Sequence, residues 1–132
     1  MNVFVDTSAF LAVLNKDDLN NESASATLIN LVESGEELLC TNYILVEAYA
    51  LIQNRMGMDA INDFQKDILP SINITWIDKE EHKDIVTRFI SSNRRQLSFV
   101  DCSSFEIMKQ LGIKTVFTFD KHFREQGFDV IP

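Results

Sequence analysis

The chain has 132 residues, of which 45% are apolar and 24% are charged, and a formal net charge of −8. A chain of this length can bury a core without disulfides or a structural metal, so we expect one globular domain over residues 1–132. Its two cysteines, Cys40 and Cys102, fit neither a disulfide framework nor a zinc motif. No apolar run reaches the ~18 residues that span a bilayer, and no signal peptide opens the chain. These features argue against a membrane or secreted protein and favour the cytoplasm.

The charge is unevenly distributed along the chain. Residues 1–66 hold three Lys or Arg against ten Asp or Glu, whereas residues 67–132 hold nine against ten. Between Arg88 and Arg124 there are seven basic residues and only three acids. A basic zone of this kind suits a polyanionic substrate such as a nucleic acid. A solvated charged surface explains it equally well, so the charge pattern alone leaves both readings open.

The first half of the chain alternates short apolar runs with amphipathic helical patterns. Apolar residues at i, i+4, i+7 and i+8 favour a helix that ends at Gly35, and another helix is closed by Gly57. The expected elements are a strand at 2–5, a helix to about 15, a helix at 22–34, a strand at 38–40 and a helix from 41 or 42 to 56.

The second half continues the alternation. We expect a helix at 59–69 stopped by Pro70, a strand at 72–77, helices at 79–92 and 98–111, a strand at 116–119, a brief helical turn and an edge strand at 130–131. Strands that alternate with helices predict an α/β fold. In this case it is a three-layer fold with a mostly parallel sheet of four to five strands and helices on both faces.

Three aspartates stand at expected helix starts. Asp6 and Asp120 each follow an apolar strand, and Asp101 falls in the first turn of the helix at 98–111. Each also has a purely structural explanation, because Asp is a common N-cap and Ser98-x-x-Asp101 matches a capping box. However, the carboxyl ends of parallel strands and the helix starts that follow them line one edge of a sheet, where ligands bind.

Glu47 is harder to explain as a structural residue. It lies three or four residues from Tyr43, Ile44, Ala50 and Leu51, so it shares their helix face, which we expect to be buried. A lone buried carboxylate is costly unless it is paired or bound to a metal. A partner such as Arg55, or exposure at the helix edge, is the alternative.

Carboxylates gathered in one pocket repel one another, and a divalent cation such as Mg²⁺ or Mn²⁺ relieves that repulsion. Metal ions held in this way activate water and neutralise the charge on phosphoryl oxygens during phosphodiester hydrolysis. The four acids therefore predict metal-assisted hydrolysis, since no Ser/His/Asp or Cys/His set offers another catalytic group.

The motifs around these acids resemble those of PIN-domain ribonucleases, and the similarity is closest to VapC toxins of prokaryotic toxin–antitoxin pairs. The residues that carry the resemblance are 3–8 (VFVDTS), Glu47, 98–105 (SFVDCSSF) and 117–123 (FTFDKHF). The resemblance covers essentially the whole chain, and all four acids match the family pattern.

The resemblance implies a metal-dependent endoribonuclease with a PIN-like fold. It implies that Asp6, Glu47, Asp101 and Asp120 hold one or two Mg²⁺ or Mn²⁺ ions and that the hydroxyl of Ser8 or Thr7 supports the site. It also implies a homodimer and, for a toxin, an antitoxin partner. The candidate RNA contacts in the basic half are Arg94, Arg95, Lys121 and His122.

The same residues argue against two other functions. A phosphatase with Asp6 as nucleophile requires a second Asp two residues on, where this chain has Ser8. A phospho-accepting receiver domain requires an acidic pair after its first strand and a Lys after its last. Neither pattern is present. A housekeeping RNA-processing nuclease of the same family remains an alternative to a toxin.

Overall fold

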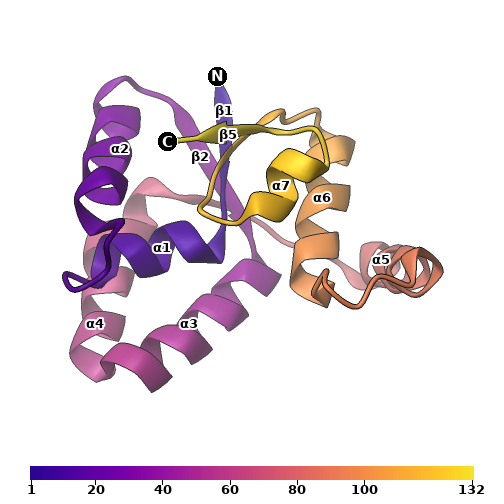
Figure 1. Cartoon of the computed structure of the whole chain (residues 1–132), viewed down its shortest axis with the longest axis horizontal. Helices are drawn as coiled ribbons and strands as arrows, with labels where there is room; N and C mark the ends of the chain where they lie inside the picture. The colour runs from indigo at the N-terminus through magenta and orange to yellow at the C-terminus, as the bar shows by residue number, and fades with distance from the viewer.

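The computed structural model describes residues 1–132, and it forms one parallel sheet surrounded by helices (Figure 1). The elements, in chain order, are β1 (Asn2–Val5), α1 (Thr7–Leu14), α2 (Asn21–Glu33), β2 (Glu37–Thr41), α3 (Asn42–Met56), α4 (Met58–Asp63), η1 (Phe64–Ile68), η2 (Leu69–Ser71), β3 (Asn73–Thr75), α5 (Lys79–Ser92), α6 (Phe99–Leu111), β4 (Thr115–Phe117), α7 (Lys121–Glu125) and β5 (Asp129–Ile131).

All four strand pairs of the sheet are parallel, in the order β3-β2-β1-β4-β5. The chain moves from β1 outward to β3 and then crosses back to β4 on the other side of β1. Right-handed crossovers in opposite directions place their helices on opposite faces. Accordingly, α1, α2 and α4 lie on one side of the central strands and α5 and α6 on the other (Figure 1). The predicted three-layer α/β fold is confirmed, and its switch in strand order falls between β1 and β4.

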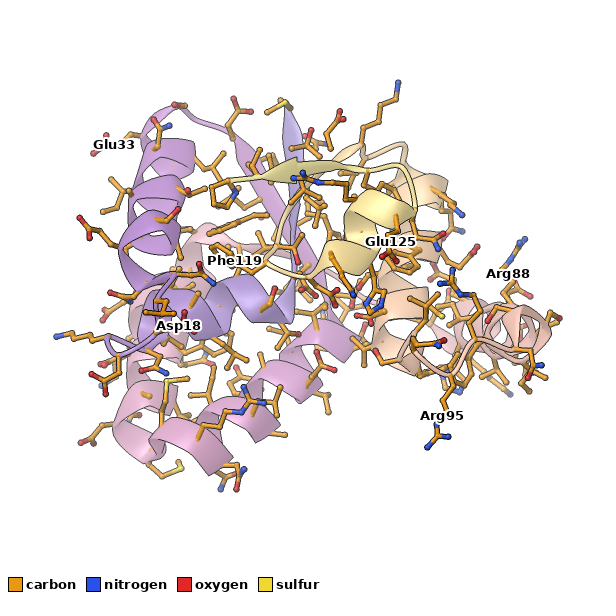
Figure 2. The ribbon with its side chains drawn as sticks, viewed as in Figure 1. Asp18, Glu33, Arg88, Arg95, Phe119 and Glu125 are labelled. Atoms are coloured by element: carbon orange, nitrogen blue, oxygen red, sulfur yellow. The ribbon has the colours of Figure 1, made fainter.

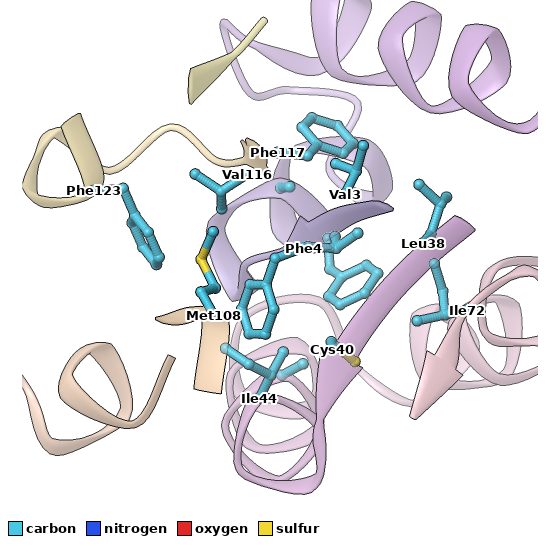
Figure 3. Packing of buried hydrophobic residues seen from close by; sticks show 14 of the residues in the cluster. Val3, Phe4, Leu38, Cys40, Ile44, Ile72, Met108, Val116, Phe117 and Phe123 are labelled. Carbon is cyan, nitrogen blue, oxygen red and sulfur yellow. The ribbon is translucent and has the colours of Figure 1, made fainter. Parts of the chain in front are cut away.

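The core fills both faces of β1, because alternate side chains of a strand point in opposite directions. Phe4 lies with Met108 and Ile44 on one face, whereas Val3 lies beside Phe117 on the other (Figure 3). These side chains are 0–1% exposed. A central strand buried on both faces explains why its sequence is a continuous apolar run, and it fixes the strand end from which Asp6 follows.

The helix predicted at 59–69 is wrong as a single α-helix. The α-helix ends at Asp63, a π-helical turn covers Phe64–Ile68, and a 3₁₀ turn covers Leu69–Ser71. Pro70 has no N–H, and its ring would clash with the carbonyl four residues earlier in an α-helix. The preceding turn is therefore wider, and the N–H of Leu69 donates to the carbonyl of Phe64, five residues back.

Two strands are shorter than predicted. The third covers Asn73–Thr75 and not 72–77, and the fourth covers Thr115–Phe117 and not 116–119. Thr118 lies just beyond the end of the fourth strand, and its hydroxyl donates to the buried carboxylate of Asp6. Both cysteines are free thiols. No helix has the length and apolar character to cross a bilayer.

Candidate functional site

Asp6 is the buried centre of the candidate site, with 5% of its surface exposed. It is the N-cap of α1, as its position after β1 predicts. Its Oδ2 accepts from the hydroxyls of Ser8 at 2.7 Å and Thr118 at 2.8 Å, and from the Ser8 N–H at 3.3 Å. No hydrogen bond engages its Oδ1, which leaves one oxygen of a buried carboxylate available to a ligand.

The same two hydroxyls connect Asp6 to the segment that carries Asp120. The Phe119 N–H donates to the Ser8 hydroxyl at 3.0 Å, and the Asp120 N–H donates to the Thr118 hydroxyl at 2.9 Å. Each hydroxyl thus accepts a hydrogen bond from one backbone N–H and donates its own hydrogen bond to Asp6. Asp6 thereby fixes the backbone beside Asp120 across the β1–β4 junction. The family resemblance proposed Ser8 as a supporting residue, and its contacts suit that role.

Asp101 and Asp120 both cap helices, as their structural explanation predicts. Asp101 forms the capping box of α6 with Ser98, since each backbone N–H donates to the other side chain. Asp120 is the N-cap of α7, where its Oδ1 accepts the His122 N–H at 2.9 Å. Although they cap different helices, the carboxylates of Asp101 and Asp120 lie close together. Candidate ligand atoms of Asp101, Asp120 and His122 all lie within 4.8 Å of one another.

Glu47 differs from its prediction in burial. The fully buried stripe of α3 is Ile44, Ala48 and Ile52, whereas Ala50 is exposed and Glu47 lies half-buried at the edge of the stripe. Arg55 forms no ion pair with it. Burial raises the pKa of Glu47, and the nearby Thr7 hydroxyl offsets only part of that rise. The Thr7 hydroxyl itself forms no hydrogen bond. Glu47 therefore faces the site without a structural cation.

Burial and repulsion between carboxylates act together at the candidate site. Burial raises the pKa of Asp6, Glu47 and Asp101 above the ordinary values of 3.8 and 4.5. Mutual repulsion adds to burial: Asp6 and Asp120 raise the pKa of Glu47, Asp120 and Glu47 raise that of Asp101, and Asp101 raises that of Asp6. A divalent cation would offset this repulsion.

The donor set fits such an ion. Carboxylate oxygens are the ligands that Mg²⁺ and Mn²⁺ prefer, and imidazole nitrogen is a good ligand for transition metals. The Nδ1 atom of His122 is buried, forms no hydrogen bond and lies 2.9 Å from Oδ1 of Asp120, so it adds a nitrogen to the candidate donor set. Asp6 and Glu47 stand outside the group of Asp101, Asp120 and His122.

The predicted RNA contacts lie farther apart from one another than the acidic residues do. Lys121 is exposed beside Asp120, and with Arg124 it lines a hollow of about 290 Å³ that reaches Thr118. Arg94 and Arg95 are exposed on the segment after α5, and Arg95 points away from the body of the molecule (Figure 2). His122 is only 20% exposed and faces Asp120, so its placement suits a ligand of the acidic cluster better than a phosphate contact.

Sequence reasoning missed Thr118, which is 1% exposed and bonded to Asp6. A polar residue at the end of the strand beside β1 is the signal that could have found it. Arg124, which lines the hollow at Asp120, was likewise not singled out. A larger hollow between α5 and α6, of about 400 Å³, contains the Arg88–Glu106 ion pair and none of the four carboxylates.

The fold and the site define a parallel α/β protein with an acidic cluster at its topological switch point, where such folds bind ligands. The family model of the PIN domain matches residues 3–129. The chain therefore belongs to the PIN-domain family.

The relatives are similar in length to this chain. The 23S rRNA-specific endonuclease VapC20 of Mycobacterium tuberculosis is 26% identical over 132 residues, which cover 96% of this chain and 95% of the relative. The VapC ribonuclease of Aquifex aeolicus is 22% identical over 128 residues, which cover 96% and 93%.

Solved structures agree with the fold. The crystal structure of M. tuberculosis VapC20, a sarcin–ricin loop cleaving toxin, has a TM-score of 0.82 at 26% identity and covers 98% of this chain and 99% of that one. VapBC2 of Rickettsia felis, bound to a promoter DNA fragment, has a TM-score of 0.72 at 12% identity, with 98% and 97% covered. FitAcB of Neisseria gonorrhoeae has a TM-score of 0.70 at 18% identity, with 100% and 97% covered.

Proposed function

We propose that residues 1–132 form one metal-dependent endoribonuclease domain that acts as the toxin of a toxin–antitoxin pair. The observation that carries the proposal is the close approach of the Asp101 and Asp120 carboxylates in a PIN-domain fold. The charge of Asp101 acts on Asp6, and that of Glu47 acts on Asp101, which supports placing all four acids in one site. The names of the relatives support the same activity, since VapC20 and the Aquifex protein are an endonuclease and a ribonuclease.

In this proposal Asp101 and Asp120 bind Mg²⁺ or Mn²⁺ directly, and Asp6 contributes its free Oδ1 oxygen. When bound, the ion supplies an activated water and neutralises charge on the phosphoryl oxygens. Glu47, half-buried and free of a cation, is placed to ligate the ion or to accept a proton from water. Ser8 and Thr118 hold Asp6 in position, and the hydroxyl of Thr7 adjoins Glu47.

The substrate is RNA, bound through the basic half of the chain. Lys121 lies nearest to the acidic cluster, and Arg94 and Arg95 would contact phosphates farther along the strand. Phosphate contacts release counterions, so each makes binding more dependent on salt. We predict that the double variant Arg94→Ala/Arg95→Ala binds RNA more weakly and with a smaller salt slope, measured by fluorescence anisotropy with chelator present. An unchanged slope would exclude these arginines as phosphate contacts.

Two protein partners are part of the proposal. The description of VapC20 as a toxin supports an antitoxin partner for this chain, as does the resemblance to VapC toxins. The family resemblance supports a homodimer, and exposed apolar residues on α2, such as Ile29 and Val32, offer a surface for association. Light scattering after size-exclusion chromatography tests the dimer. Copurification with the product of a small adjacent gene tests the antitoxin.

The activity itself is tested with purified protein and RNA. Cleavage should require added Mg²⁺ or Mn²⁺ and should stop when EDTA is present, because in this proposal the bound ion supplies the activated water and neutralises charge on the phosphoryl oxygens. Cleavage that withstands EDTA would overturn the proposal.

A further inference from the structure

His122 is held in an unusual position beside the acidic cluster. Its Nδ1 is shielded from solvent and lies 2.9 Å from Oδ1 of Asp120, which is an ion pair only when the imidazole is protonated, and the contact does not have the geometry of a hydrogen bond. A simple His–Asp ion pair would align the ring N–H with the carboxylate. The two atoms instead lie side by side, together with Asp101, within 4.8 Å.

The neighbouring residues fix this position. On one side, the backbone N–H of His122 donates to the Asp120 cap. On the other, Phe123 is fully buried and packs edge-to-face on Phe105, with 5.0 Å between ring centroids. Phe105 is one turn after Asp101 in α6, so this contact also sets how α7 sits against the Asp101 carboxylate. The position of His122 is therefore built into the packing of two helices.

The spacing suits two ligands of one metal ion. Adjacent ligands of an octahedral ion with bonds of about 2.1 Å lie roughly 3.0 Å apart, close to the observed 2.9 Å between Nδ1 and Oδ1. Carboxylates bind Mg²⁺ and Mn²⁺ alike, whereas imidazole favours transition metals. A mixed set of two carboxylates and one imidazole should therefore discriminate between these two ions.

We infer that His122 is a metal ligand in addition to Asp101 and Asp120, and that its nitrogen makes the site selective for Mn²⁺ over Mg²⁺. The inference rests on the metal dependence in the proposed function and deepens it. It also reassigns His122 from RNA contact to metal ligand.

Pulsed electron paramagnetic resonance of bound Mn²⁺ tests this ligand directly, without any cleavage assay. We expect the spin-echo modulation to contain a ¹⁴N coupling, and we expect histidine-specific ¹⁵N labelling to change it. The coupling should disappear in His122→Gln and persist in His82→Gln. His82 is a matched control, because it is the only other histidine and contacts Tyr43.

Competition between the two ions gives the second readout. The preference for Mn²⁺ over Mg²⁺ should fall at least about tenfold in His122→Gln, the scale of loss that follows disturbance of a metal ligand, and should be unchanged in His82→Gln. Mn²⁺ that binds the unaltered protein with no ¹⁴N coupling would overturn the assignment of His122 and leave the nuclease proposal intact. Failure of Mn²⁺ to bind at all would overturn both.

Discussion

At the scale of single residues, each aspartate of the site has both a structural role and a place in the pocket. Asp6, Asp101 and Asp120 all bond helix-start amides, as their sequence positions predict. Helix capping and metal binding are compatible roles for these residues, because a carboxylate has several acceptor positions. A cap fixes the carboxylate at a helix start, and here three helix starts meet.

Thr118 shows what the sequence could not reveal. Its buried hydroxyl links Asp6 to the Asp120 N–H across 112 residues of sequence separation, and no local pattern marks such a contact. By contrast, Ser8 lies two residues from Asp6 and was found by motif. Helix caps depend on residues close in sequence, so they can be predicted locally. The contact of Thr118 with Asp6 can be predicted only when the strand order is known.

We predict that Thr118→Val lowers both stability and RNA cleavage. The substitution preserves volume but leaves the Asp120 N–H unpaired and removes a donor from Asp6, which should cost about 1–3 kcal/mol. Thr115→Val, three residues earlier at the start of β4, is the matched control, since the Thr115 hydroxyl contacts only the Met1 sulfur at 4.0 Å. Thermal melting and initial cleavage rates measure the effect. Equal behaviour of the two variants would show that the Thr118 link has no role.

At the scale of elements, the sequence predicted the start of α6 from the capping box at Ser98-x-x-Asp101, and the structure shows a second capping box at the start of α5. The sequence-based prediction failed where tertiary packing and Pro70 act together, as in the π-helical turn that buries Phe64. It also placed Glu47 on a buried face, although the fully buried stripe of α3 is one residue away. The burial of a helix face depends on how the helix is rotated against its neighbours, which periodicity only approximates.

The two capping boxes give a matched test of electrostatic strain. Glu81 in α5 and Asp101 in α6 occupy the same capping position, but only Asp101 is repelled by other carboxylates of the site. Glu81→Gln should lower the metal-free stability by roughly 0.3–1 kcal/mol, because a favourable helix-end charge is lost. Asp101→Asn should instead raise the melting temperature of the metal-free protein, since relief of repulsion exceeds that loss.

Calorimetry in chelator measures both variants. If Asp101→Asn melted lower, as Glu81→Gln should, the carboxylate would act only as a cap, and the shared pocket would be wrong.

At the scale of the whole molecule, the site exists because the strand order reverses between β1 and β4. The sequence predicted the alternation of strands and helices, and therefore the layers and the parallel sheet. The strand order itself could not be derived from periodicity, yet it decides that Asp6 and Asp120 become neighbours. The family resemblance does not give the strand order, but it does imply that Asp6 and Asp120 belong to one metal site.

Repulsion between the carboxylates of the site should make the stability of the metal-free protein depend on pH. Asp6, Glu47 and Asp101 have raised pKa values in the folded state. Above the ordinary values the folded protein therefore holds more protons than the unfolded chain, so stability falls as pH rises. The melting temperature of metal-depleted protein should fall as the pH rises above these ordinary values, with a weaker fall in Asp101→Asn. Equal pH profiles for the two proteins would contradict the coupling between these carboxylates.

The central claim is that this carboxylate cluster cleaves RNA with a bound metal ion, and cleavage under single-turnover conditions at saturating Mn²⁺ tests it most directly. Asp101→Asn is compared with Glu106→Gln, a neutralisation on the same helix whose partner is Arg88. We predict that Asp101→Asn loses cleavage by at least about a hundredfold, comparable to loss of a key electrostatic contact in a transition state, whereas Glu106→Gln stays close to the unaltered protein. Full Mn²⁺-dependent cleavage by Asp101→Asn would contradict the account.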